Sequence, residues 1–332
     1  MTKQVIKRGL IVMSALLMLS GCNKDKSNTA QDAKRGDPVL VLDAGQEPRE
    51  VLRYKVAHGT TTTSNMDFGL ASLATSSAGA QLSVVPGVRL HVVSGPSMQS
   101  KRGTRFDVRI VKAEALVPEG ADPELARDLN QSASVLNNIG GWVEIDERGI
   151  IQASELNERG KRADVPVRLL VMIINARTSL SRVLLPAEPV GTGARWEARK
   201  DLVLYGFKVN QVDTYTLTEK VGDELRLNVA IQQTALPQSV TFDEEGIELT
   251  VESFSMNASG EIIANLNALE ANAAASGEST GMLKVRTVDG TEAVEIDRAF
   301  QVRMTVTYDL GTAAAGAAAE AAEKSGKSGS GY

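Results

Sequence analysis

Phe106-Asp-Val-Arg-Ile-Val111 alternates apolar with polar residues, and this alternation is the pattern that decides the fold. Successive side chains of a β-strand point to opposite faces, so such a segment buries one face and exposes the other. Val88 to Val93 and Leu52 to Val56 alternate in the same way. Each of these segments is therefore predicted to be a half-buried strand.

The alternation continues along the chain between short turn signals. Glu147-Arg148-Gly149 separates two alternating segments and predicts a hairpin, since glycine readily adopts the positive φ of a tight turn. Further strands are expected over residues 196–205, 207–217, 225–232, 247–258, 261–266, 282–288, 292–296 and 300–308, with turns at residues 221–223, 259–260 and 289–290. Connections this short predict a mainly β (α+β) fold, a long antiparallel meander that forms a curved sheet or half-barrel.

Two segments break the alternation and predict helices packed on the sheet. Asp122-Pro123 supplies an N-cap and a first-turn proline, and leucines follow at helical spacing as far as Gly140. The second helix is expected from Pro166 to Leu185, where Pro186 stops it, and its apolar surface is broad. Four of its residues are candidates to face a hydrophobic ligand, namely Leu170, Ile173, Ile174 and Leu184.

The first residues of the chain resemble a signal that targets a protein to the cell envelope. Lys3, Lys7 and Arg8 precede an apolar run that is too short to remain as a membrane span, which is typical of a secretory signal. The run ends at Leu19-Ser-Gly-Cys22, which holds the chain's one cysteine and resembles the lipobox of bacterial lipoproteins. The resemblance implies that Cys22 carries acyl chains such as palmitate after cleavage. Asn23 then favours the outer membrane, facing the periplasm, over the inner membrane.

These signals divide the chain into four parts. Residues 1–21 are the expected signal peptide, and residues 22–38 are the lipidated cysteine with a polar, flexible tether. The tether would hold the protein about 20 to 25 Å from the bilayer on average. Residues 39–310 are expected to form a single β-rich domain, and the Ala/Gly/Ser-rich residues 311–332 a disordered tail.

Composition argues against several kinds of chemistry. Loss of the signal's three basic residues would lower the formal net charge from -5 to about -8, which does not favour nucleic acid as a partner. With His58 and His91 the only histidines and one cysteine already assigned, we expect no cofactor and no metal site. The Asp243 to Gly246 turn has acidic oxygens that suit calcium, but a solvated hairpin tip is the favoured interpretation.

One catalytic motif matches by its letters alone. Gly277 to Gly281 reads G-x-S-x-G, like the nucleophile elbow of hydrolases, with Ser279 at its centre. In that family a histidine follows the serine, whereas no histidine follows His91 here. We therefore expect residues 277–281 to be a loop between strands and the protein not to be an enzyme. A hydrolase stays open as an alternative if Ser279 or an acidic pair lies in a pocket.

A longer resemblance rests on Leu184-Leu-Pro-Ala-Glu-Pro-Val-Gly-Thr-Gly-Ala-Arg-Trp196, together with the L-R-Y-K segment at residues 52–55 and the G-G-x-V-x-I-D-x-x-G segment at residues 140–149. These residues look like a family of secreted bacterial lipoproteins to which no activity is assigned, over about residues 50–310. Pro186 should stop the helix, Gly191 and Gly193 permit a tight turn, and Trp196 begin a strand with a buried side chain. The layout also resembles, more distantly, the half-barrel of lipoprotein carriers, in which helices plug a curved sheet.

The sequence thus predicts an envelope lipoprotein that acts as a non-enzymatic binding or interaction module. Its partners would be the membrane, through the lipid, and an envelope protein or hydrophobic ligand. The alternative is a carrier or sensor of a lipid or acyl chain. A cavity between the second helix and the sheet would favour the carrier, whereas a filled core would favour the interaction module.

Overall fold

The computed structural model describes residues 36–76, 79–117, 119–120, 122–157, 180–204, 207–242, 247–289 and 292–310. The predicted signal peptide, the tether up to residue 35 and the tail from residue 311 lie outside these ranges. So do residues 166–179 of the second expected helix and the tip at residues 243–246. Those predictions remain untested.

The described residues form one antiparallel sheet of fourteen strands. The strands are β1 (Val39–Asp43), β2 (Thr62–Ser76), β3 (Gly79–Ser94), β4 (Met98–Ser100), β5 (Gly103–Leu116), β6 (Gly140–Ile145), β7 (Ile151–Leu156), β8 (Arg195–Leu204), β9 (Phe207–Val221), β10 (Glu224–Ala235), β11 (Gln238–Phe242), β12 (Ile247–Asn265), β13 (Asn272–Asp289) and β14 (Glu292–Leu310).

The order of the strands joins two meanders. One meander is β2-β3-β5-β6-β7 and the other is β8-β9-β10-β12-β13-β14, and β14 pairs with β2 to connect them. The first strand, β1, lies at the far edge beside β8, while β11 extends the pairing of β12 and β4 pairs with β5. The edges of the sheet are therefore β1 and β7, which come from the same half of the sequence.

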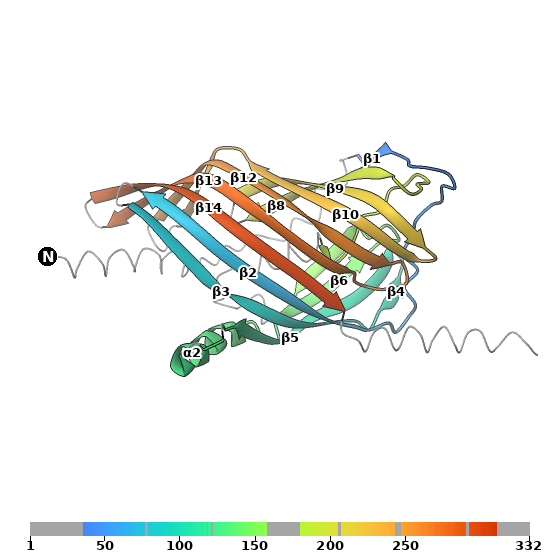
Figure 1. The fold of residues 1–332 in the computed structure, drawn as a ribbon, viewed down its shortest axis with the longest axis horizontal. Helices are drawn as coiled ribbons and strands as arrows, with labels where there is room; N and C mark the ends of the chain where they lie inside the picture. The colour runs from blue at the N-terminus through green and yellow to red at the C-terminus, as the bar shows by residue number, and fades with distance from the viewer. Residues whose placement is uncertain are drawn as a thin grey trace, which may run out of the picture.

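The sheet is strongly curled into a half-barrel, which confirms the predicted fold class (Figure 1). In Figure 1 the long strands from β10 to β3 cross the molecule side by side, while β8 and β6, from opposite parts of the strand order, lie behind them. Burial alternates along the strands: on β10 the side chains of Leu225, Leu227, Val229 and Ile231 are buried and the intervening ones are exposed. We call the face with the buried side chains the inner face.

Glycines permit two tight approaches between neighbouring strands. A side chain at Gly277 of β13 would overlap Ala258 of β12, and one at Gly260 of β12 would overlap the backbone of Ala274. At the other end of the sheet, a side chain at Gly141 of β6 would overlap the backbone of β7. Glycine within a strand typically marks a bend or a close backbone approach, and these three positions are close approaches.

The main core fills one end of the half-barrel. Inner-face residues there pack against loops formed by residues 44–61, 180–194 and 266–271. Trp196 and Tyr215 are fully buried, with ring centroids 5.7 Å apart, and Trp196 Nε1 donates a 2.7 Å hydrogen bond to the carbonyl of Leu184. The predictions of a buried Trp196 and of a turn at Gly193, whose φ is +83°, are confirmed.

One helix, α2 (Pro123–Ser134), is present in the described part of the chain. The Asp122 carboxylate accepts hydrogen bonds from the backbone N–H groups of Glu124 and Leu125, which confirms the predicted cap. The helix ends at Ser134, earlier than expected, and Leu125 is 53% exposed. Its buried residue is Ala133, and bonds to β5 come from Asn130 and from Asn137 and Asn138 of the following turn. None of the described helices is long and apolar enough to cross a membrane.

The predicted C-terminal end of the second helix is wrong. Residues 181–185 are irregular backbone, with a single helical residue at Leu180, so no helix continues to Pro186. The Leu185 N–H donates to the carbonyl of Arg148, and the Leu184 carbonyl accepts from Trp196. Bonds to other segments therefore replace the helical pattern there.

Three other local predictions are also wrong. Leu52 to Val56 is a loop in which Leu52 and Val56 are buried, since Tyr54 N–H bonds to the turn carbonyl of Glu147 instead of a neighbouring strand. Strand β12 runs through Ser259-Gly260 without a turn, because Gly260 pairs with both Val229 and Ala275. Residues 277–281 lie inside β13 and are not a loop.

Candidate functional site

A row of polar side chains crosses the inner face between apolar residues. Lys200 of β8, Gln211 of β9 and Gln233 of β10 occupy directly paired positions on three neighbouring strands. Asp213 lies one inner-face position further along β9. We call these four residues the polar belt.

Hydrogen bonds connect the polar belt into a chain. Gln233 Nε2 donates to Gln211 Oε1 at 2.7 Å, and Gln211 Nε2 donates to Asp213 Oδ1 at 2.7 Å. Lys200 Nζ donates to Asp213 Oδ2 at 2.6 Å, which forms an ion pair. The belt therefore carries one positive and one negative charge, and these charges are paired.

The members of the belt differ in exposure. Asp213 is completely buried and Gln211 is 1% exposed, whereas Gln233 is 8% exposed and the Lys200 side chain 15%. An unpaired ion buried in this way would cost several kcal/mol, so the ion pair is what permits the burial. Tyr215 OH lies 3.4 Å from Asp213 Oδ2, and burial, together with the Asp213 charge, raises the pKa of Tyr215 well above its usual value.

Apolar residues lie on both sides of the polar belt. Toward the packed end, Ala198 and Ile231 pair with Asp213 and lead into the main core. Toward the opposite end, a separate cluster is built on Phe207 of β9 and on Leu249 and Val251 of β12. The partly buried side chains that pack on this cluster are Ala235, Val240, Phe254 and Leu283. We call it the distal cluster.

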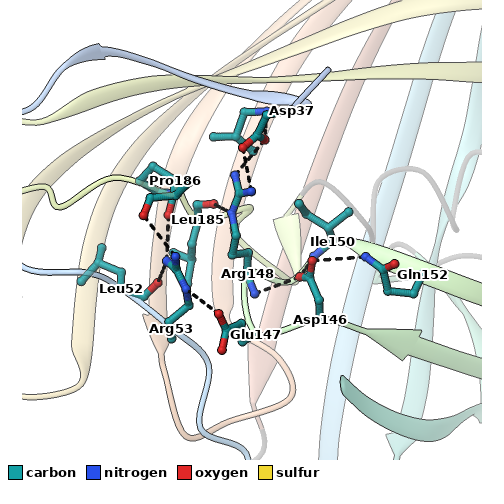
Figure 2. Close-up of polar contacts among 12 residues, drawn as sticks. Asp37, Leu52, Arg53, Asp146, Glu147, Arg148, Ile150, Gln152, Leu185 and Pro186 are labelled. Atoms are coloured by element: carbon teal, nitrogen blue, oxygen red, sulfur yellow. Dashed lines mark hydrogen bonds and ion pairs between the residues drawn. The ribbon is translucent and has the colours of Figure 1, made fainter. Parts of the chain in front are cut away.

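A second polar group closes the packed end of the half-barrel. Arg148, in the turn between β6 and β7, makes a bidentate ion pair with Asp37, which precedes β1; the two N–O distances are 2.8 and 2.9 Å (Figure 2). Arg148 Nε also donates to the Leu185 carbonyl at 2.9 Å. This clasp connects segments adjacent to the two edge strands of the sheet.

Arg53 strengthens the clasp from a neighbouring loop. Its guanidinium donates to the carbonyls of Leu52 and Pro186 and to the Glu147 carboxylate, as Figure 2 shows. Burial opposes ionisation of Asp37, but the hydrogen bonds and charge of Arg148 outweigh it and lower the pKa of Asp37 below its usual 3.8. The arrangement holds the loops at this end of the molecule together.

The predicted site residues lie mostly outside the described residues. This is true of Cys22 and of Leu170, Ile173 and Ile174. Leu184 is described, and it is 7% exposed within the main core, in the irregular segment that bonds to Trp196. Its proposed role on a ligand-facing helix is not supported by that local backbone.

The residues weighed for catalysis are separated in the structure. Ser279 sits within β13 and pairs with Met256, so it lacks the strand-to-helix turn of a nucleophile elbow. His58 lies in an exposed turn, as expected, and His91 Nε2 lies 2.9 Å from the Glu114 carboxylate on the other face of β3. Among the residues that the structure describes, no group of three potential metal ligands comes together.

The polar belt was missed by the sequence analysis, although a signal for it exists. Along β9 every second residue from Phe207 to Leu217 faces inward, and Gln211 and Asp213 interrupt this otherwise apolar phase. Gln233 interrupts the same phase on β10. The sequence signal for the polar belt is therefore a polar residue at a position that alternation predicts to be buried.

The cavity expected between the second predicted helix and the sheet falls on residues 166–179, which lie outside the described residues. A hollow of about 500 Å³ that the described residues do line is open to solvent. Its lining includes the exposed residues Thr234, Ser253 and Met282, beside the bulge of β12. This hollow is distinct from the polar belt.

Comparison with known proteins gives distant likenesses. No family model matches the chain, and no curated protein matches it. A structure of lipovitellin, studied for its lipid–protein interactions, is 8% identical and has a TM-score of 0.40; the match covers 77% of this chain and 25% of lipovitellin. OmpF of Salmonella typhi in complex with daunomycin is 7% identical, with a TM-score of 0.22 and coverage of 74% and 97%. Ail of Yersinia pestis is 7% identical, with a TM-score of 0.10 and coverage of 75% and 99%.

Proposed function

We propose that this protein is a lipid-anchored, non-enzymatic binding protein of the cell envelope that holds a hydrophobic ligand on the inner face of its half-barrel. The observation that supports this most directly is the distal cluster, a group of apolar side chains on the inner face beyond the main core, whose Phe207, Leu249 and Val251 are 4 to 5% exposed. A binding site that is mainly apolar with a few placed polar groups is typical of sites for hydrophobic small molecules. The polar belt beside the cluster has that character.

The anchor is part of the proposal. Cys22 follows the apolar run directly, and β1 begins at Val39, so residues 22–38 are available as a tether. Several acyl chains on one cysteine would give stable membrane attachment, since each buried methylene contributes about 0.8 kcal/mol. The protein would then act next to the membrane, where hydrophobic ligands are concentrated.

A second candidate is an interaction module that binds another envelope protein. It is favoured by β1, an edge strand of the sheet, on which Leu40 and Leu42 are 50% and 47% exposed. The backbone of an edge strand can pair with a strand from another protein, and exposed apolar side chains can add contacts to that pairing.

Two measurements test the proposed function. Radioactive palmitate should label the full chain but not a Cys22→Ser variant, and equal labelling of both would reject the anchor. The full chain, purified from envelopes in a mild detergent, should carry lipid-sized mass in native mass spectrometry. A ligand-free mass, together with a protein crosslinked to β1 in intact envelopes, would support the interaction module instead.

A further inference from the structure

We infer that the polar belt is the head-group site for a neutral acyl lipid, such as a monoacylglycerol, whose chain lies on the distal cluster. The inference rests on the proposed function and specifies its ligand class. It begins from an anomaly: Lys200, Gln211 and Gln233 lie in one row beside the buried Asp213, although the other inner-face side chains of β8, β9 and β10 are mostly apolar. Apolar side chains would fill these positions without the desolvation cost of polar groups.

The charges of the belt decide what kind of head group it suits. Lys200 and Asp213 form an ion pair at 2.6 Å, so their charges offset each other. A carboxylate brought to this row would interact favourably with Lys200 but would be repelled by the buried Asp213 charge beside it. A neutral head group with hydroxyl and ester oxygens needs no counter-ion and requires only hydrogen-bonding partners.

Gln233 supplies the hydrogen-bonding capacity. Its side chain makes one hydrogen bond within the part of the chain that the structure describes, through Nε2 to Gln211. An amide group has two N–H donors and a carbonyl that accepts, so it can still donate to an ester oxygen and accept from a hydroxyl. Gln233 and Lys200 are the more exposed members of the belt. The buried Gln211 accepts a hydrogen bond from Gln233, and the buried Asp213 accepts one from Lys200.

The position of the distal cluster fits an acyl chain attached to that head group. Phe207 faces inward on β9, two inner-face positions from Gln211, and Phe254 pairs with Ala235 next to Gln233 along β10. Both side chains belong to the distal cluster. A lipid with its head at Gln233 would therefore have apolar contacts in the direction away from the main core.

The test uses two photoreactive lipids with the same diazirine-bearing chain, one a monoacylglycerol and one a fatty acid, on the purified full chain. The monoacylglycerol should reach half-maximal labelling at a concentration about tenfold lower, and the labelled peptides should come from residues 207–209 and 247–256. Equal or tighter labelling by the fatty acid would overturn the neutral-lipid inference. So would labelled peptides from elsewhere in the chain.

A matched pair of variants separates head-group recognition from general hydrophobic binding. Gln233→Met keeps the size of the side chain and should raise the half-maximal concentration of the monoacylglycerol about three- to tenfold, as expected for one neutral hydrogen bond. The fatty acid should be affected less. Gln232→Met, on the exposed face of the same strand, should leave both lipids unchanged.

The outcomes distinguish this inference from the proposed function. Labelling by neither lipid would reject both. Labelling by both lipids with no difference between the Gln232→Met and Gln233→Met chains would leave the proposed function standing and reject the head-group site. The comparison of the two lipids on the unsubstituted chain decides the inference even if Gln233→Met fails to fold, which circular dichroism would reveal.

Discussion

The ion pair between Lys200 and Asp213 permits the polar belt to lie on the mainly apolar inner face. Each charge is largely or completely removed from water, and each is stabilised by the other at 2.6 Å. The attraction between them mainly offsets the cost of desolvation, so the pair adds little net stability. Loss of either partner alone would leave a buried charge without compensation.

We therefore predict that Lys200→Met lowers the free energy of unfolding by about 3 to 5 kcal/mol. The matched control is Lys208→Met, since Lys208 is exposed on the outer face of β9 and should tolerate the change within about 0.5 kcal/mol. Urea denaturation of both variants measures the difference. A loss for Lys200→Met as small as that of the control would mean that the ion pair does not stabilise the buried carboxylate.

The alignment of the polar belt could not be predicted from residue patterns. Alternation correctly predicted that β9 and β10 bury one face, but it did not indicate that Lys200, Gln211 and Gln233 would align in one row. Their alignment depends on the register between strands, which long-range pairing determines. The Arg148 to Asp37 ion pair depends in the same way on the closure of the whole sheet.

At the scale of the element, the long strands β12 and β13 depend on glycine where they approach closely. The sequence analysis interpreted Ser259-Gly260 and Gly277 to Gly281 as breaks, since glycine and serine are typical of turns. In this sheet Gly260 and Gly277 lie within strands, because a residue without a side chain leaves room for the atoms of the neighbouring strand. Strands rich in small residues, such as β2 and the first half of β13, were missed for the same reason.

We predict that Gly277→Ala destabilises the protein by about 1 to 3 kcal/mol, because the added methyl group overlaps Ala258 and the Asn257 carbonyl. Ser276→Ala, at the exposed neighbouring position, is the control and should be nearly neutral. Thermal unfolding followed by circular dichroism compares the two. Equal melting temperatures would show that β12 and β13 can separate at this position without cost.

At the scale of the whole molecule, the clasp holds the two edges of the half-barrel near each other. The pKa of Asp37 is lowered in the folded protein, so its ionisation stabilises the fold above the usual pKa of 3.8, and this contribution is lost as the pH falls through the folded value. Asp37→Asn should therefore reduce stability at pH 7, and the difference from the unsubstituted protein should shrink below about pH 4.

Arg148→Gln provides the check on that prediction. It should reproduce the pH dependence of Asp37→Asn, and the double variant should be less destabilised than the two single effects combined, since each removes the same ion pair. Urea unfolding between pH 3 and pH 7 gives the comparison. Additive effects in the double variant would indicate that the two residues act independently.

The pairing of β14 with β2 has a consequence for the order in which the protein forms. Ser64 lies opposite Leu310, so the middle of the finished sheet unites an early segment of the chain with the last strand that the structure describes. Each meander is built mainly from neighbours in sequence, whereas the contact that unites them joins strands more than 200 residues apart, so it waits until β14 has been synthesised. The half-barrel is consequently completed only after translation of β14, and until then the unpaired edge of β2 has to be kept from other strands.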